Sequence, residues 1–170
     1  MHFADSLERD VTALKLFLDE VPAFLRDRTA AVAQAGDTVG RDAYRMTQTV
    51  ALEAGIHLLN SMVDGALLIL ANRTRGTDIK ARDMGRFRDT LEGEIEERLR
   101  LKLSTLTGWD QVDKIRRHAN ALKNRLGLTF ARGTAAPLTI TEDVNVTPAQ
   151  LVELLVGARA WLLDIDKRLS

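Results

Sequence analysis

The chain has 170 residues, enough for one ordinary domain, and 45% of them are hydrophobic, so a buried core is available. Basic and acidic residues balance at 24 each, which excludes a bulk electrostatic attraction to nucleic acid or to an anionic membrane. There is no cysteine, which excludes disulfide bonds, thiolate catalysis and thiolate-bound zinc. Leucine and alanine are abundant and aromatic residues make up only 5%, which favours helices over strands. We therefore expect a single all-α domain over residues 1–170.

The first predicted helix begins near Asp5, because Glu8 follows three residues later as in a capping box. Its apolar stripe alternates spacings of four and three and consists of Leu7, Val11, Leu14, Leu18, Val21 and Leu25. Pro22 lies within the stripe and either kinks this helix or starts another one. Gly36 is expected to end the helix in a turn.

The second predicted helix covers residues 42–72 and should be the central, most buried one. Its apolar face consists of Leu52, Ile56, Leu59, Val63, Leu67 and Leu70, broadened by Leu68 and Ile69. Polar residues recur about once per turn, namely Glu53, His57, Asn60 and Asp64, which favours a core-facing helix over a membrane span. We expect no membrane partner, no signal peptide and a cytoplasmic protein. His57 is interpreted as a core or boundary histidine with Glu53 as its partner.

The third predicted helix covers residues 83–107 and ends at Gly108. Its apolar face repeats every four residues through Phe87, Leu91, Ile95, Leu99 and Leu103. The other faces carry a dense run of charges that includes Glu92 and Glu96, interpreted as a solvated face with helix-spaced ion pairs.

The fourth predicted helix covers residues 110–127, and its apolar stripe consists of Val112, Ile115, Ala119, Leu122 and Leu126. A long loop or small hairpin is expected at residues 128–146. The last helix should start at Pro148, with Thr147 and Gln150 forming a capping box. Its core face is expected to consist of Leu151, Leu154, Leu155, Ala158, Trp161, Leu162 and Ile165. Trp109 and Trp161 are expected core anchors. The elements together predict an up-and-down bundle of about five helices.

Chemical motifs are scarce. There is no phosphate-binding glycine loop and no pair of histidines within one helical turn, so we predict neither a cofactor nor a metal. Residues 110–133 are the exception, with six basic residues against two acidic ones, a local excess of four positive charges. An ordinary solvated helix face with cations near its C-terminal end explains this pattern, and a phosphate-contacting surface is the alternative.

At the end of the fourth helix, residues 123–129 read Lys-Asn-Arg-Leu-Gly-Leu-Thr. This stretch resembles the motif of the HEPN superfamily, in which an arginine, usually followed by a polar residue, precedes a histidine by four to six residues. Glu53 in an apolar second helix and Thr147-Pro148 before a last amphipathic helix match the family's layout over residues 40–169. The resemblance implies a compact helical bundle, often dimeric, in toxin–antitoxin and antiviral defence systems. Many members are metal-independent ribonucleases.

Two positions depart from this motif. Lys123 stands where the family has its arginine, and Leu128 stands where it has its histidine. Leucine cannot transfer protons, and general acid–base help is worth roughly 10²–10⁴-fold, so we expect RNA cleavage to be weak or absent and assign no catalytic residue. The candidate RNA-binding residues are Arg117, His118, Lys123 and Asn124.

Two functions remain open. The first is a catalytically degenerate HEPN-like domain that binds RNA or a nucleotide. The second is a non-enzymatic homodimeric interaction module, with a protein partner and no nucleic-acid role. An active ribonuclease that uses other residues is a third interpretation.

Overall fold

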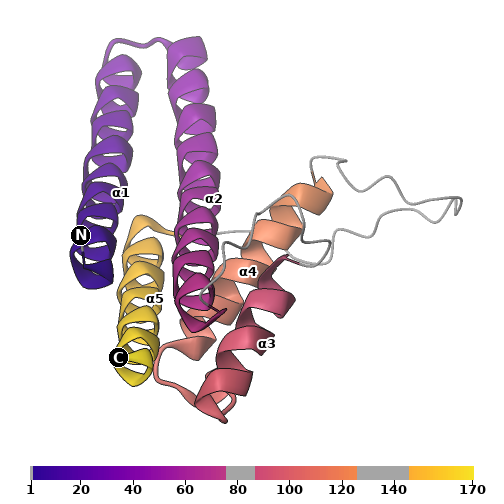
Figure 1. The fold of residues 1–170 in the computed structure, drawn as a ribbon. Helices are drawn as coiled ribbons and strands as arrows, with labels where there is room; N and C mark the ends of the chain where they lie inside the picture. The colour runs from indigo at the N-terminus through magenta and orange to yellow at the C-terminus, as the bar shows by residue number, and fades with distance from the viewer. Residues whose placement is uncertain (1, 76–86, 126–145) are drawn as a thin grey trace, which may run out of the picture.

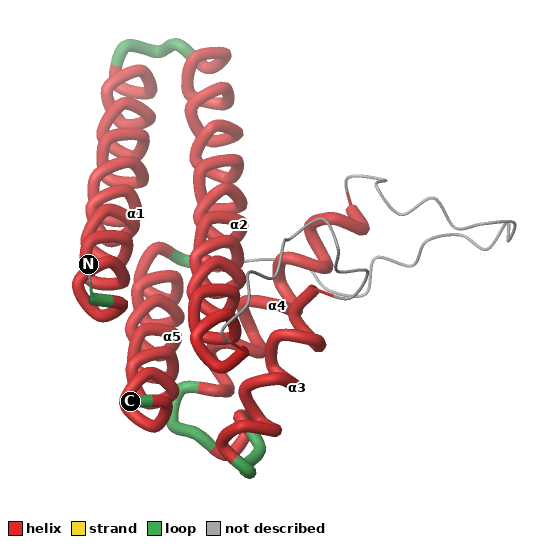
Figure 2. The backbone as a smooth tube through the Cα atoms, viewed as in Figure 1, coloured by secondary structure: helices red, strands yellow, loops and turns green. Residues whose placement is uncertain are grey.

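The computed structural model describes residues 2–75, 87–125 and 146–170. These residues form five α-helices and one short 3₁₀ helix: α1 (Phe3–Gln34), α2 (Thr38–Arg75), α3 (Phe87–Leu99), η2 (Leu103–Thr105), α4 (Trp109–Arg125) and α5 (Pro148–Leu169). The all-α prediction is confirmed, because no strand occurs in these three ranges (Figure 2). The predicted loop or hairpin at 128–146 lies outside the described residues, apart from position 146.

The long helix α2 is the centre of the bundle, as predicted. It runs antiparallel to α1 and contacts all four other α-helices (Figure 1). α1 and α5 pack on one side of α2, while α3 and α4 pack on the other side of its C-terminal half. α4 also packs directly against α5, so both α2 and this contact join the two parts of the bundle.

One prediction about α1 is wrong in detail, and one of the two alternatives for Pro22 is excluded. The helix begins at Phe3 with His2 as its N-cap, so Asp5 and Glu8 lie inside the helix and form no capping box. Pro22 does not start a second helix, because α1 continues through it to Gln34. The proline ring is buried, and this apolar burial offsets the missing backbone hydrogen bond.

Helix α2 begins four residues earlier than predicted. After Gly36, which has a φ of +76°, the Asp37 carboxylate accepts a hydrogen bond of 2.8 Å from the backbone N–H of Gly40. An aspartate at this position caps the first turn, so the helix already starts at Thr38. Ile69 does not broaden the core face of α2, since its side chain is exposed.

Helix α3 ends at Leu99, eight residues before the predicted end at residue 107. Arg100 takes a left-handed φ of 54°, which breaks the helix. Glu96 then binds the returning chain, because it accepts hydrogen bonds from the Leu103 backbone N–H at 2.9 Å and from Lys102 Nζ at 2.7 Å. Leu103 still enters the core, but from η2. The predicted start at residue 83 lies outside the described part of the chain.

Helix α5 matches its prediction closely. Thr147 and Gln150 form the reciprocal capping box, and Pro148 is the first helical residue. All seven predicted core positions of the helix are buried, and Trp161 is fully buried with its indole N–H bonded to the Leu103 carbonyl at 3.0 Å. Gly108, with a φ of +93°, lets α4 start against α5, because a Cβ atom there would lie 2.2 Å from the Gly157 carbonyl oxygen.

The turn between α1 and α2, with the adjoining parts of both helices, projects beyond the start of α5 (Figure 1). We call residues 19–54 the α1–α2 arm. Only Pro22 and Leu25 are buried in it, although the structure describes all of its residues. Four large apolar side chains of the arm are 55–79% exposed: Phe24, Val39, Met46 and Val50.

By length and composition, one helix among the described residues could cross a membrane. It is α2, in which an 18-residue window has a mean hydropathy of 1.5. Of this window, 44% is buried against the rest of the protein, and the core helices of water-soluble proteins have the same properties. The expectation of no membrane partner stays a prediction.

Candidate functional site

A polar pocket lies between α2, α3 and α4. It has a volume of about 340 Å³, within the range of small-molecule sites. Its lining consists of Asn60, Asp64, Arg88, Asp89, Arg116, Asn120 and Lys123. We call it the α2–α3–α4 pocket. Three basic side chains face two acidic ones, so the lining carries a net charge of +1.

Helix α4 supplies Arg116, Asn120 and Lys123 to this pocket. Spacings of four and three place these residues on one face of the helix. The neighbouring face, about 90° away around the helix, is buried and consists of Val112, Ile115, Ala119 and Leu122, as predicted. Packing of that apolar stripe therefore fixes which polar residues of α4 face the pocket.

Helices α2 and α3 are joined beside the pocket by a hydrogen-bonded network. Arg88 on α3 donates from Nε and Nη2 to Asp64 Oδ1 on α2, at 2.8 and 2.6 Å. Its Nη2 also donates to Asn60 Oδ1 at 3.2 Å, and Asn60 donates to Asp64 Oδ2 at 2.8 Å. The guanidinium of Arg88 is therefore held in one orientation.

Arg116 is also held in place. Its Nη2 bonds to Asp113 Oδ1 at 2.6 Å, and its guanidinium lies 5.9 Å from the ring centroid of Trp109. Trp109 in turn packs against Trp161, with ring centroids 5.7 Å apart. Burial raises the pKa of Asp113, but hydrogen bonds from Arg116 and Arg117 outweigh it and bring the pKa below its usual value. Asp113 therefore stays ionised near neutral pH and orients both arginines.

Glu92 corrects the interpretation of the third helix as a solvated charged face. Its side chain is part-buried, and Oε1 is buried without a hydrogen-bond partner in the described structure. Burial raises the pKa of Glu92 to about 7, although the nearby Arg88 and Arg116 act to lower it. At neutral pH this carboxyl group holds a proton about half of the time, so it only partly offsets the positive charge beside it.

The structure separates the four predicted RNA-binding residues. Lys123 lines the pocket, whereas Arg117 and His118 do not. Arg117 is exposed and paired with Asp113 at 2.5 Å, and His118 is part-buried. Six and five residues separate them from Lys123, which turns them about 120° and 140° away around the helix. Asn124 lies on α4, and Leu128 lies outside the described residues.

Sequence reasoning missed Arg88 altogether. It did note Asn60 and Asp64, but only as polar interruptions of an apolar helix. Their spacing of four residues was a usable signal, because it places an amide and a carboxylate side by side on a helix that is otherwise buried. Such a pair requires a polar partner from another helix, since buried polar groups are almost always hydrogen-bonded.

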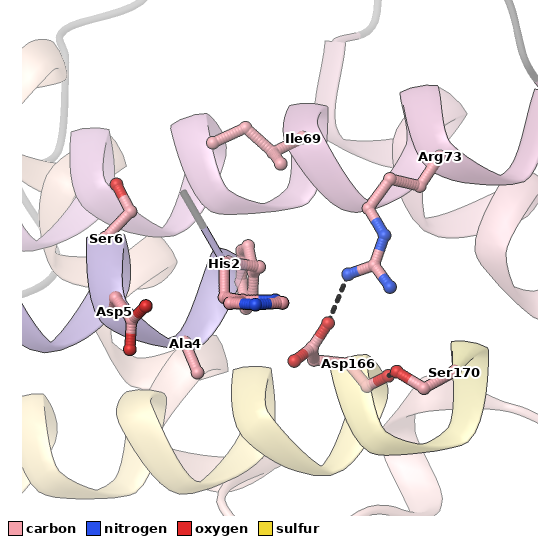
Figure 3. Close-up of a pocket in the computed structure, with 9 residues that line it drawn as sticks. His2, Ala4, Asp5, Ser6, Ile69, Arg73, Asp166 and Ser170 are labelled. Carbon is pink, nitrogen blue, oxygen red and sulfur yellow. Dashed lines mark hydrogen bonds and ion pairs between the residues drawn. The ribbon is translucent and has the colours of Figure 1, made fainter.

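A second pocket, of about 720 Å³, lies where the start of α1 meets the ends of α2 and α5. Figure 3 shows Arg73 of α2 and Asp166 of α5 pointing toward each other across it, with His2 beside them. The lining has one basic residue, Arg73, against two acidic ones, Asp5 and Asp166, so this pocket lacks the excess positive charge of the α2–α3–α4 pocket.

No cluster of three or more metal-ligating side chains occurs among the residues that the structure describes. No family model matches the sequence, and comparisons with curated proteins and with solved structures find no match. The HEPN resemblance stays a prediction.

Proposed function

We propose that this protein binds phosphate groups of RNA or of a nucleotide in the α2–α3–α4 pocket, with weak or absent cleavage. The observation that carries the proposal is the convergence of Arg88, Arg116 and Lys123 on one pocket from two helices. The toxin–antitoxin or antiviral defence context is part of the proposal and rests on the HEPN resemblance of the sequence alone.

Three properties of the pocket support phosphate as the ligand. Its arginines are fixed by Asp64 and Asp113, so little side-chain entropy is lost when they bind an anion. Lys123, exposed near the end of α4, adds a mobile positive charge, and the Asn120 amide adds neutral hydrogen-bonding groups.

The same lining explains why we propose binding and not catalysis. None of the seven lining residues is a histidine. Lysine and arginine side chains are hydrogen-bond donors and not acceptors. Of the two carboxylates in the lining, Asp64 is already bonded to Arg88 and Asn60. The pocket therefore provides groups that stabilise phosphate charge but no histidine to act as general base.

A salt-dependent titration with a generic single-stranded RNA tests the proposal. Binding should weaken steeply with salt, because each phosphate contact releases a counterion. Lys123→Gln should lower the affinity for RNA. It should also reduce the slope of log K against log salt by the amount that corresponds to about one phosphate contact. Lys114→Gln is the matched control, since Lys114 is an exposed lysine of the same helix that does not line the pocket. No binding at low salt, or equal effects of the two substitutions, would contradict the proposal.

A second candidate function is a homodimeric interaction module without a nucleic-acid role. It is favoured by the α1–α2 arm, whose exposed apolar side chains would gain hydrophobic stabilisation on contact with a second copy. Light scattering at tens of micromolar tests it, and a strict monomer would exclude it.

A further inference from the structure

The strongest unexplained feature of the pocket is the Nη1 atom of Arg88. The side chain is only 9% exposed, which is rare for an arginine. Its Nε and Nη2 are bonded to Asp64 and Asn60, but Nη1 is buried and has no hydrogen-bond partner in the described residues. A buried cationic donor without an acceptor is costly, so the site favours any anion that can reach Nη1.

The charges around Arg88 leave room for such an anion. Asp64 pairs with Nε and Nη2 of the guanidinium, and Asp89 also lines the pocket. Glu92, one turn further along α3, carries a carboxyl group near Arg88, yet no hydrogen bond joins it to Nη1 and Glu92 Oε1 is itself unpartnered. Because burial raises the pKa of Glu92 to about 7, it does not fully neutralise Arg88 near neutral pH. Arg116 and Lys123 add positive charge from α4.

We propose that Arg88 is the phosphate-binding arginine of this pocket, that it contacts a phosphate oxygen through Nη1, and that Asn60 and Asp64 act as positioning residues. The inference rests on the proposed function and deepens it. Lys123 provides a point charge, whereas the planar guanidinium of Arg88 provides directed donors that are already oriented. The arginine comes from α3, not from the α4 motif.

Nuclear magnetic resonance of the full, unsubstituted chain tests this, and a substituted chain serves only to assign the signal. The Arg88 Nε–H and the Arg159 Nε–H are both bonded to carboxylates, Asp64 and Glu8, so both should give observable signals in ¹⁵N-arginine-labelled protein. Titration with inorganic phosphate should shift the Arg88 signal to saturation and leave the Arg159 signal unchanged. The Arg88 signal is assigned by its loss in Arg88→Lys.

The source of the phosphate is distinguished by two further titrations. A mononucleotide offers a terminal phosphate, and a dinucleoside monophosphate offers only an internal phosphodiester. A saturable shift of the Arg88 signal with either supports the proposal and identifies the kind of phosphate that is bound. If RNA binding saturates and depends on Lys123 while the Arg88 signal does not move, the role of Arg88 is wrong and the proposed function stands. If RNA does not bind at all, both fail.

A pair of substitutions gives an independent measurement. Arg88→Lys keeps the charge but cannot hold Asp64 and reach a ligand at once, so RNA affinity should fall about tenfold or more. Arg159→Lys is the control, because Arg159 also joins two helices through a carboxylate but lies outside the pocket, and RNA affinity should stay within about twofold. Asp64→Asn should weaken RNA binding and shift the free protein's Arg88 signal. Equal affinity of Arg88→Lys and the parent protein would overturn the proposal.

Discussion

The two halves of α2 lie in opposite environments. From Gly55 to Ala71 the helix buries at least one residue in every turn, whereas from Thr38 to Ala54 it buries none. The boundary coincides with the start of α5, because a Cβ atom on Gly55 would lie 3.1 Å from Leu151 Cδ1. Beyond that level α2 loses the contact with α5 that covers its lower half. Burial along this helix is therefore decided by its neighbours.

We call the bundle outside the α1–α2 arm the body. The body and the arm depart from ordinary burial in opposite directions. The body of the bundle shields polar groups, Arg88 with Asn60 and Asp64, whereas the α1–α2 arm exposes Phe24 and Val50. Buried charge and large exposed apolar side chains are the informative exceptions in a folded protein. The proposed ligand pocket therefore lies in the body, and the proposed dimer surface lies on the arm.

The largest expected difference between the regions is in stability. Trp161→Ala empties a fully buried site and should lower the free energy of unfolding by about 3–5 kcal/mol. Val50→Ala removes exposed atoms from the arm and should cost less than about 0.5 kcal/mol. Urea denaturation of both variants measures the two values. Similar losses for the two would mean that the arm is covered in solution.

The second prediction concerns self-association. Phe24→Asp combined with Val50→Asp places charges on the exposed apolar surface of the arm, and should weaken a dimer about tenfold or more. Val156→Asp, at an exposed valine of α5, should leave the dimer unchanged. Sedimentation velocity over a concentration series measures the dissociation constants. A dimer that is weakened only by the α5 substitution would place the interface on the body.

The third prediction concerns the pH dependence of stability. Since burial raises the pKa of Glu92 from 4.5 to about 7, the folded protein keeps a proton there that the unfolded chain releases. The stabilisation is fully present below pH 4.5 and is lost as the pH rises to about 7. Glu92→Gln removes this loss, so its melting temperature relative to that of the parent should rise from pH 5 to pH 8.

Thermal unfolding of parent and variant at both pH values measures this difference. Glu20→Gln, at an exposed glutamate of the arm, serves as the control. An offset between the melting temperatures of Glu92→Gln and the parent that is the same at pH 5 and pH 8 would show that Glu92 is ionised in the folded protein.

The smallest effect is expected at the ion pair between α1 and α5. Arg159 Nη2 lies 2.5 Å from Glu8 Oε1, but both side chains are more than two-fifths exposed, so the pair is screened by water. A double-mutant cycle with Arg159→Gln and Glu8→Gln should give a coupling energy of about 0.2–1 kcal/mol. A coupling energy well above this range would show that the ion pair contributes strongly to the packing of α1 against the body.

The sequence by itself determined the helices with regular apolar stripes. The core positions of α4 and α5 were predicted almost residue by residue, because packing against one neighbour produces a stripe of fixed period. Gly36 and the Thr147–Gln150 capping box marked ends correctly, since both act within a few residues. Lys123 was named from the motif resemblance and the local excess of charge, and it lines the α2–α3–α4 pocket, while its role stays a prediction.

The tertiary structure alone decided the features that the apolar pattern of a helix does not contain. The end of α3 depends on Glu96 binding the chain seven residues later, and Pro22 lies inside α1 because its ring is buried. In the sequence, Arg88 is one of many charged residues on an amphipathic helix. Folding brings it beside Asp64 and Asn60, which lie 24 and 28 residues earlier in the chain. A local pattern records which face of a helix is apolar, but a polar pocket between three helices exists only once their packing brings distant side chains within hydrogen-bonding distance.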